Sequence, residues 1–145
     1  MPRPSNLPAN WRDVVSATVS LAEKKTAAEI KVVVLNYCWV DIREKARVLF
    51  FRHGLQKTKN RNAVMIVLVL KNREFLVYGD KGIHEKVTDE FWLHTRDSML
   101  SSFQKGDIVE GLCHGVQLVG EKLALYFPYQ HNDENELSDE VIYET

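Results

Sequence analysis

Two nearly continuous apolar runs with a helix-forming segment between them constrain the fold of this chain most strongly. Residues 30–35 read IKVVVL and residues 64–70 read VMIVLVL, and such β-branched runs are typical of strands covered on both faces. Strands joined through a helix cross over right-handedly and run parallel. Residues 74–78 follow the second run after a short polar turn, which predicts an antiparallel hairpin.

Apolar residues recur at helical spacing in four further segments. The expected helices cover residues 11–25, 42–54, 87–104 and 108–128. Asn10, Asp41 and Asp107 each precede a helix with an acidic residue three positions later, so capping boxes are expected there. Three glycines of the last helix are expected where it approaches the sheet closely. The order of elements predicts an α/β fold, a three-layer αβα sandwich with a small mixed sheet and about four helices.

Length and composition indicate one globular domain, since the chain has 145 residues, 45% of them hydrophobic and 27% charged. We expect an extended arm over residues 1–9 and the domain over residues 10–130. An acidic tail follows over residues 131–145, either disordered, which the sequence slightly favours, or forming a short edge strand. The beginning lacks the apolar stretch of a signal peptide, and no apolar run reaches the roughly 20 residues of a membrane span. The expected location is therefore the cytoplasm.

Several chemistries lack their sequence patterns. Cys38 and Cys113 have no CxxC spacing, so both are expected to be free thiols. The five histidines show no zinc-hydrolase spacing, and GxSxG, P-loop and GxGxxG motifs are missing. Residues 1–131 carry 19 Lys and Arg against 14 Asp and Glu, but no basic block is interleaved with aromatics. No catalytic residue is predicted, and no nucleic-acid partner is expected.

Polar residues are expected to converge at one edge of the sheet. The antiparallel third strand ends at Gly79 and Asp80, beside the starts of the first two strands at Glu29 and Asn62, whereas Asp41 lies at the opposite edge. Carboxylate and amide oxygens suit Ca²⁺ or Mg²⁺. Two alternatives stay open, because Asp beside Gly is common turn chemistry and nearby cations would neutralise the acids in salt bridges. Those cations are Lys57, Lys59, Arg61 and Lys81.

The same segments resemble the TPM domain family, which occurs in thylakoid-lumen photosystem repair proteins, animal membrane modulators and many bacterial proteins. The matching positions are Glu23, Thr26, Glu29 and Ile30; the helix over 46–54; Thr58, Arg61 and Asn62; Gly79, Asp80, Gly82 and Ile83; Trp92; Phe103 and Gly106; Gly111 and Leu112; and Phe127 and Pro128. The resemblance covers most of the chain. It implies an αβα sandwich. The chain is expected to be a bacterial, stand-alone member that departs from common members of the family in lacking a signal peptide and a membrane anchor.

The resemblance also implies binding of one or two divalent cations, Ca²⁺ above Mg²⁺, near the loops. Carried over position by position, the expected ligands are Glu29, Asp80 and Asp89, with Asn62 and Glu85 as second choices. The implied role is a regulatory or accessory module, monomeric, with an unidentified protein partner. The alternative is a metal-dependent acid phosphatase, the activity described for a plant relative.

Overall fold

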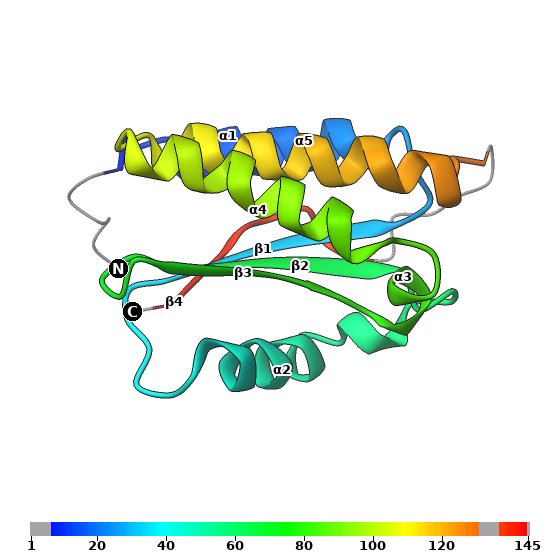
Figure 1. The fold of residues 1–145 in the computed structure, drawn as a ribbon, viewed down its shortest axis with the longest axis horizontal. Coiled ribbons are helices and arrows are strands. Elements are labelled where there is room, and N and C mark those ends of the chain that lie inside the picture. Colours follow the sequence, from blue (N-terminus) through cyan, green and yellow to red (C-terminus); the bar gives the residue numbers. More distant parts are fainter. Residues whose placement is uncertain (1–6, 131–136, 145) are drawn as a thin grey trace.

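The computed structural model describes residues 7–130 and 137–144. Within these residues the chain forms five α-helices, one short 3₁₀ helix and four strands (Figure 1). The elements are α1 (Trp11–Glu23), β1 (Glu29–Leu35), α2 (Ile42–Arg52), η1 (Leu55–Lys57), β2 (Ala63–Val69), β3 (Glu74–Gly79), α3 (Lys81–His84), α4 (Asp89–Gln104), α5 (Ile108–Tyr126) and β4 (Ile142–Glu144).

The strands form one mixed sheet in the order β3-β2-β1-β4. β1 runs parallel to β2, and β3 runs antiparallel to β2, as predicted from the sequence. Helices α1, α4 and α5 cover one face and α2 covers the other (Figure 1), so every residue of β1 and β2 is buried. The three-layer αβα architecture is thereby confirmed.

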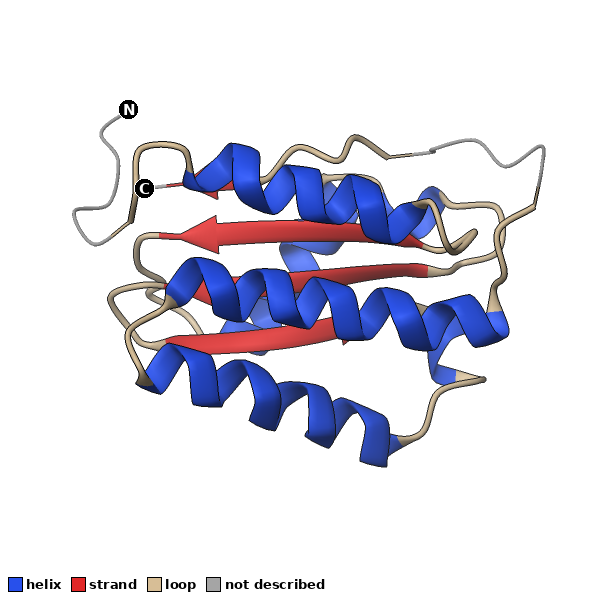
Figure 2. Ribbon diagram, turned by 90° about the horizontal axis from the view of Figure 1, so that it is seen from above, coloured by secondary structure: helices blue, strands red, loops and turns tan. Residues whose placement is uncertain are grey.

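Side chains on the two faces of the sheet form two hydrophobic clusters. The α5 glycines face neighbouring helices, not the sheet: an added Cβ at Gly115 would lie 2.5 Å from Met99 Sδ of α4. The predicted close approach at these glycines exists, but the sheet was the wrong partner. The helices α1, α4 and α5 pack side by side in one layer (Figure 2), so the glycines meet α1 and α4.

The caps follow the sequence prediction in part. The Asp41 carboxylate accepts a hydrogen bond from the Arg43 N–H at 2.8 Å, and Asp107 accepts one from the Glu110 N–H at 3.0 Å. Asn10 makes no side-chain cap bond. The single-turn helix α3 was not predicted, because one turn offers too few positions to show a period.

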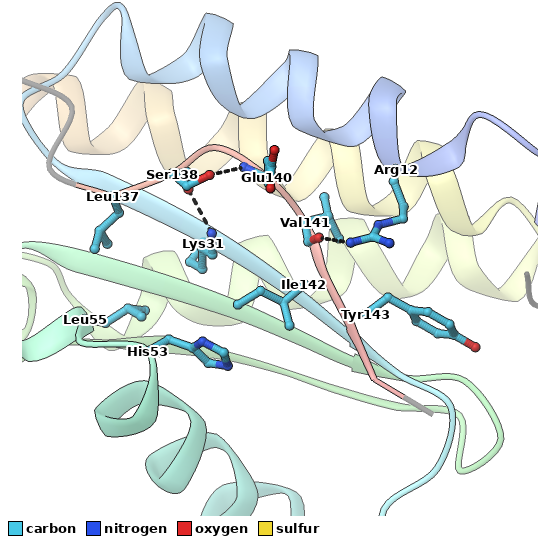
Figure 3. Close-up of a pocket in the computed structure, with 10 residues that line it drawn as sticks. All are labelled: Arg12, Lys31, His53, Leu55, Leu137, Ser138, Glu140, Val141, Ile142 and Tyr143. Carbon is cyan, nitrogen blue, oxygen red and sulfur yellow. Dashed lines mark hydrogen bonds between the residues drawn. The ribbon is translucent and has the colours of Figure 1, made fainter. Parts of the chain in front are cut away.

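The C-terminal segment packs against the sheet as an edge strand. β4 pairs with β1 from Val33 to Leu35, which is one of the two predicted alternatives for the tail. Arg12 Nη2 donates to the Val141 carbonyl at 2.8 Å, and Lys31 Nζ donates to the Ser138 carbonyl at 2.9 Å (Figure 3). Val141 is only 2% exposed. Residues 131–136 of the predicted tail and 1–6 of the predicted arm lie outside the described residues.

None of the helices within the described residues combines the length and hydrophobicity required to cross a membrane.

Candidate functional site

The predicted convergence of polar residues at one sheet edge is present. Glu29 pairs with Ala63 across β1 and β2, and Val64 pairs with Gly79 across β2 and β3. Glu29, Asn62 and Asp80 are 2%, 1% and 5% exposed, although residues of these types are seldom fully buried unless partnered. Their burial at one edge makes this edge the candidate site.

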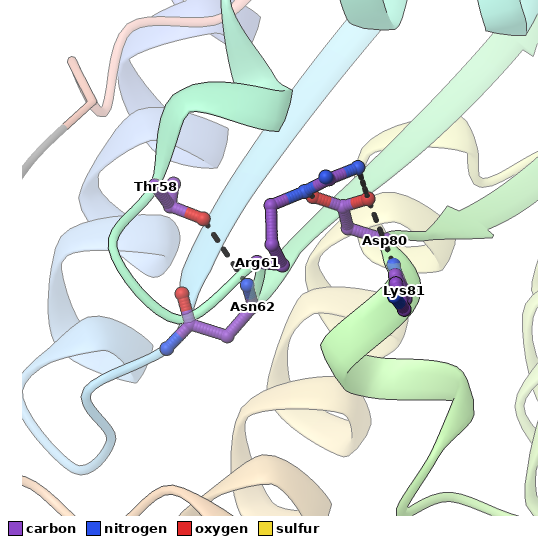
Figure 4. A network of polar contacts seen from close by, with 5 residues as sticks. All are labelled: Thr58, Arg61, Asn62, Asp80 and Lys81. Carbon is purple, nitrogen blue, oxygen red and sulfur yellow. Dashed lines mark hydrogen bonds and ion pairs between the residues drawn. The ribbon is translucent and has the colours of Figure 1, made fainter.

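Asp80 is held by Arg61 and by the backbone of α3 (Figure 4). The Nε and Nη2 atoms of Arg61 each donate to an Asp80 carboxylate oxygen at 2.7 Å, and the Lys81 N–H donates at 2.8 Å. This two-pronged geometry is the strongest form of a charge-assisted hydrogen bond. The hydrogen bond to Asp80 raises the pKa of the Arg61 guanidinium above its usual value. Of the four cations considered in the sequence, Arg61 is the one that neutralises this acid.

The loop that carries Arg61 is fixed by a close approach to α3. Arg61 adopts a φ of +50°, a conformation uncommon for residues other than glycine. Its carbonyl accepts a hydrogen bond from the Gly82 N–H at 2.9 Å. A Cβ at Gly82 would lie 2.4 Å from the Asn60 carbonyl oxygen, so only glycine permits this contact. Gly82 therefore positions Arg61 relative to Asp80.

Asn62 joins the loop before β2 to the loop before β1. Its N–H donates to Thr58 Oγ1 at 3.1 Å, its Nδ2 donates to the Ala27 carbonyl at 3.2 Å, and its carbonyl accepts from the Glu29 N–H at 3.2 Å. Its side-chain oxygen Oδ1 is buried without a hydrogen-bond partner among the described atoms. An unsatisfied buried acceptor costs about 1–3 kcal/mol, so this oxygen is suited to accept a donor or a cation.

Two of the predicted ligands lie outside this buried group. Glu85 follows α3 and Asp89 begins α4, and both are exposed. Asp89 lines a groove beside β3 together with Trp92. Within the described residues no three His, Cys, Asp or Glu side chains are positioned to hold a metal ion. The donors present therefore fit a hard cation in part, and amide and backbone oxygens would have to complete its shell.

A second carboxyl pair was missed in the sequence. Glu23 Oε2 accepts the Ile30 N–H at 2.7 Å, and its other oxygen is buried. Burial raises the pKa of Glu23 to about 11, with the carboxyl groups of Asp139 and Glu29 adding to the shift. Asp139 accepts a hydrogen bond from Ser20 Oγ at 2.7 Å. No local pattern signals this pair, because its two members come from α1 and the C-terminal segment.

The fold and this edge define an αβα sandwich protein with a buried polar cluster where β1 and β2 begin. The sequence model of the TPM domain family matches residues 6–122. The chain belongs to the TPM domain family.

Solved structures support this assignment. The chain is similar to the BA42 protein of the psychrophilic bacterium Bizionia argentinensis, with 32% identity, a TM-score of 0.90 and 94% of each chain covered. The N-terminal domain of a protein from P. gingivalis shows 24% identity and a TM-score of 0.71, covering 88% of this chain and 84% of that one. The N-terminal domain of cg2496 from Corynebacterium glutamicum shows 14% identity and a TM-score of 0.64, covering 88% and 83%. The last two show the fold alone. Among curated proteins none matches the chain.

Proposed function

We propose that this TPM domain is a divalent-cation-binding module, regulatory or accessory in role, whose site lies where Glu29, Asn62 and Asp80 are buried. The observation that carries the proposal is the unsatisfied Asn62 Oδ1, an oxygen donor buried at the same edge as the Asp80 carboxylate. Hard oxygen donors of this kind favour Ca²⁺, with Mg²⁺ as the second choice.

Arg61 competes with the cation in this proposal. Its guanidinium holds both Asp80 oxygens, yet its side chain is 45% exposed against 6% for Asp80. The arginine can therefore leave toward solvent while the carboxylate stays in place. Cation binding would exchange one positive partner of Asp80 for another and release Arg61 to the surface.

Glu85 and Asp89 enter the proposal as outer acidic groups. Both are exposed, so their role would be to attract cations toward the edge and not to form the buried part of the shell.

Calorimetric titration of Ca²⁺ and Mg²⁺ tests the proposal. Wild type and Asp41→Asn are expected to bind, whereas Asp80→Asn loses affinity at least tenfold. Asp41 is a matched control, since it also caps a helix through a backbone N–H but lies at the opposite sheet edge. Arg61→Met is expected to bind more tightly than wild type, because the competing cation is gone.

Amide chemical shifts recorded during the same titration locate the site. Movement confined to residues near 29, 60 and 79–90 supports it. Absence of cation binding in wild type, or equal affinity in wild type and Asp80→Asn, would contradict the proposal. The alternative of a metal-dependent phosphatase stays a prediction, to be tested by p-nitrophenyl phosphate turnover that disappears in Asp80→Asn.

A further inference from the structure

β3 is the open edge of the sheet within the described residues, since the strand order begins with it. The Asp80 N–H bonds to the Ala63 carbonyl at 2.9 Å. In antiparallel pairing the bonded positions alternate, so Leu76 and Tyr78 direct their backbone groups toward β2. Phe75 and Val77 direct their N–H and C=O groups outward.

A groove of about 320 Å³ lies along this edge. The strand side of its lining is three successive residues, Phe75, Leu76 and Val77. Phe75 and Val77 pack toward the face that α1, α4 and α5 cover and Leu76 packs toward the α2 face. All three lie on the edge strand, so the groove runs along the outer side of β3. The outward backbone groups of Phe75 and Val77 therefore border the groove.

Helix α4 supplies the other wall. Trp92, Leu93 and Arg96 line the groove together with Asp89, and their spacing places them on one face of the helix. α4 lies above the sheet in Figure 1 and outside β3 in Figure 2, where it diverges from the strand toward its Asp89 end. Leu93 is 51% exposed, although it belongs to an apolar lining.

We propose that this groove binds an extended peptide of a partner protein, which adds to β3 as an antiparallel strand beneath α4. The added strand would bond to the Phe75 and Val77 backbone, the mode by which exposed sheet edges recognise peptides. An apolar side chain of the peptide would contact Trp92 and Leu93. The overhang of α4 favours a single extended segment over a second copy of the whole domain, whose own α4 would compete for the space.

The charges at the two ends of the groove set the direction and chemistry of the peptide. α4 begins shortly after β3 ends and runs back along it, so Asp89 lies toward the Gly79 end and Arg96 toward the Glu74 end. Within the described part of the chain Arg96 forms one ion pair, with exposed Asp97 at 3.3 Å, a surface pair of small energy. An antiparallel peptide thus presents a basic residue to Asp89 and, further along, an acidic residue to Arg96.

The spacing of these charges defines a probe. Asp89 and Arg96 are separated by about 10 Å along the helix axis, and residues four apart in a strand are separated by about 13 Å. The blocked heptapeptide Thr-Lys-Thr-Ile-Thr-Glu-Thr places its lysine, isoleucine and glutamate on one face at this spacing.

Titration of the isotope-labelled full chain with this heptapeptide tests the proposal. We expect amide shifts at Phe75 and Val77 and at the Trp92 indole N–H. Val77→Pro removes the outward N–H without removing a backbone bond to β2, a substitution that edge strands accept, and should weaken binding about tenfold, since an unmet hydrogen bond costs about 1–3 kcal/mol. The peptide with lysine and glutamate exchanged should bind several-fold more weakly.

Two further variants keep the outcome decisive. If Val77→Pro fails to fold, Leu93→Glu replaces it, because Leu93 is half exposed and an acid there opposes an apolar ligand. Asp80→Asn should leave peptide affinity within twofold, which separates this site from the proposed cation site. The proposal is overturned by absence of shifts at the groove, by binding that is unchanged in Val77→Pro or Leu93→Glu, or by shifts that arise from protein concentration alone, which would indicate a second copy.

Discussion

Asp80 and Glu23 carry two buried carboxyl groups near the same end of the sheet. The two groups are stabilised in opposite ways. Asp80 meets a guanidinium and a backbone N–H, so its charge is neutralised by a cation. Glu23 meets one backbone N–H and faces Asp139 and Glu29. Burial and these acids raise the pKa of Glu23 to about 11, so it keeps its proton at neutral pH.

The comparison shows that burial alone does not determine the charge of an acid. A cation site needs a carboxylate that is ionised before the metal arrives. Asp80 meets this requirement because its present partner is itself a cation, whereas Glu23 would first have to lose its proton. The proposed cation site therefore centres on Asp80 and not on Glu23.

The largest effect is expected from removing the cation beside Asp80. Arg61→Met leaves a buried carboxylate with only the Lys81 N–H, and should lower the free energy of unfolding by about 2–3 kcal/mol. Asp80→Asn should cost less, about 1–2 kcal/mol, because the remaining arginine is half exposed. Urea denaturation at pH 7 measures both. Equal costs would mean that the desolvation of Asp80 does not control this pair.

The next effect concerns pH. Below about pH 4.5 Glu23 is protonated in both the folded and the unfolded chain, and above that value only the folded chain retains the proton, up to about pH 11. Stability should therefore fall as pH rises from 6 to 8, by about 1.4 kcal/mol per pH unit, because the folded chain holds one more proton than the unfolded chain over this range. Glu23→Gln should flatten this part of the profile, because an amide cannot ionise.

Asp139→Asn serves as the control for that experiment, since it removes the facing acid while leaving Glu23 in place. Loss of this acid lowers the pKa of Glu23 in the folded chain, so the fall in stability should end at a lower pH than in wild type. A wild-type profile that is flat from pH 6 to pH 8 would show that Glu23 is ionised in the folded chain.

The difference between the two acids also explains what the sequence could predict. The strand order placed Asp80 beside Glu29 and Asn62, whereas its bond to the Lys81 N–H was covered only by the general turn chemistry that remained as an alternative. Arg61 was one of four candidate cations, and selecting it requires the left-handed backbone and the Gly82 contact. The Glu23 and Asp139 pair was out of reach, because contacts so distant in sequence leave no local period or spacing.

A smaller effect is expected where a carboxylate makes a similar bond at the surface. Asp107 accepts the Glu110 N–H at 3.0 Å and is exposed, so Asp107→Ala should cost about 1 kcal/mol. Asn10→Ala should cost less, because Asn10 makes no cap bond. Thermal unfolding of both variants, compared with Asp80→Asn, separates the value of the cap from that of the buried ion pair.

The smallest effect is expected at a second arginine and carboxylate pair. Arg52 Nη1 lies 3.4 Å from Glu144 Oε1, and the two side chains are 50% and 33% exposed. The Arg52 pair has one long contact exposed to water, whereas Arg61 makes two short contacts with Asp80. Arg52→Gln should therefore change the free energy of unfolding by less than about 0.5 kcal/mol. Urea denaturation at low and high salt measures it, with Arg61→Met as the comparison. A loss above about 1 kcal/mol would mean that charge pairs, and not the backbone bonds of β4 and the burial of Val141, hold the C-terminal segment on the sheet.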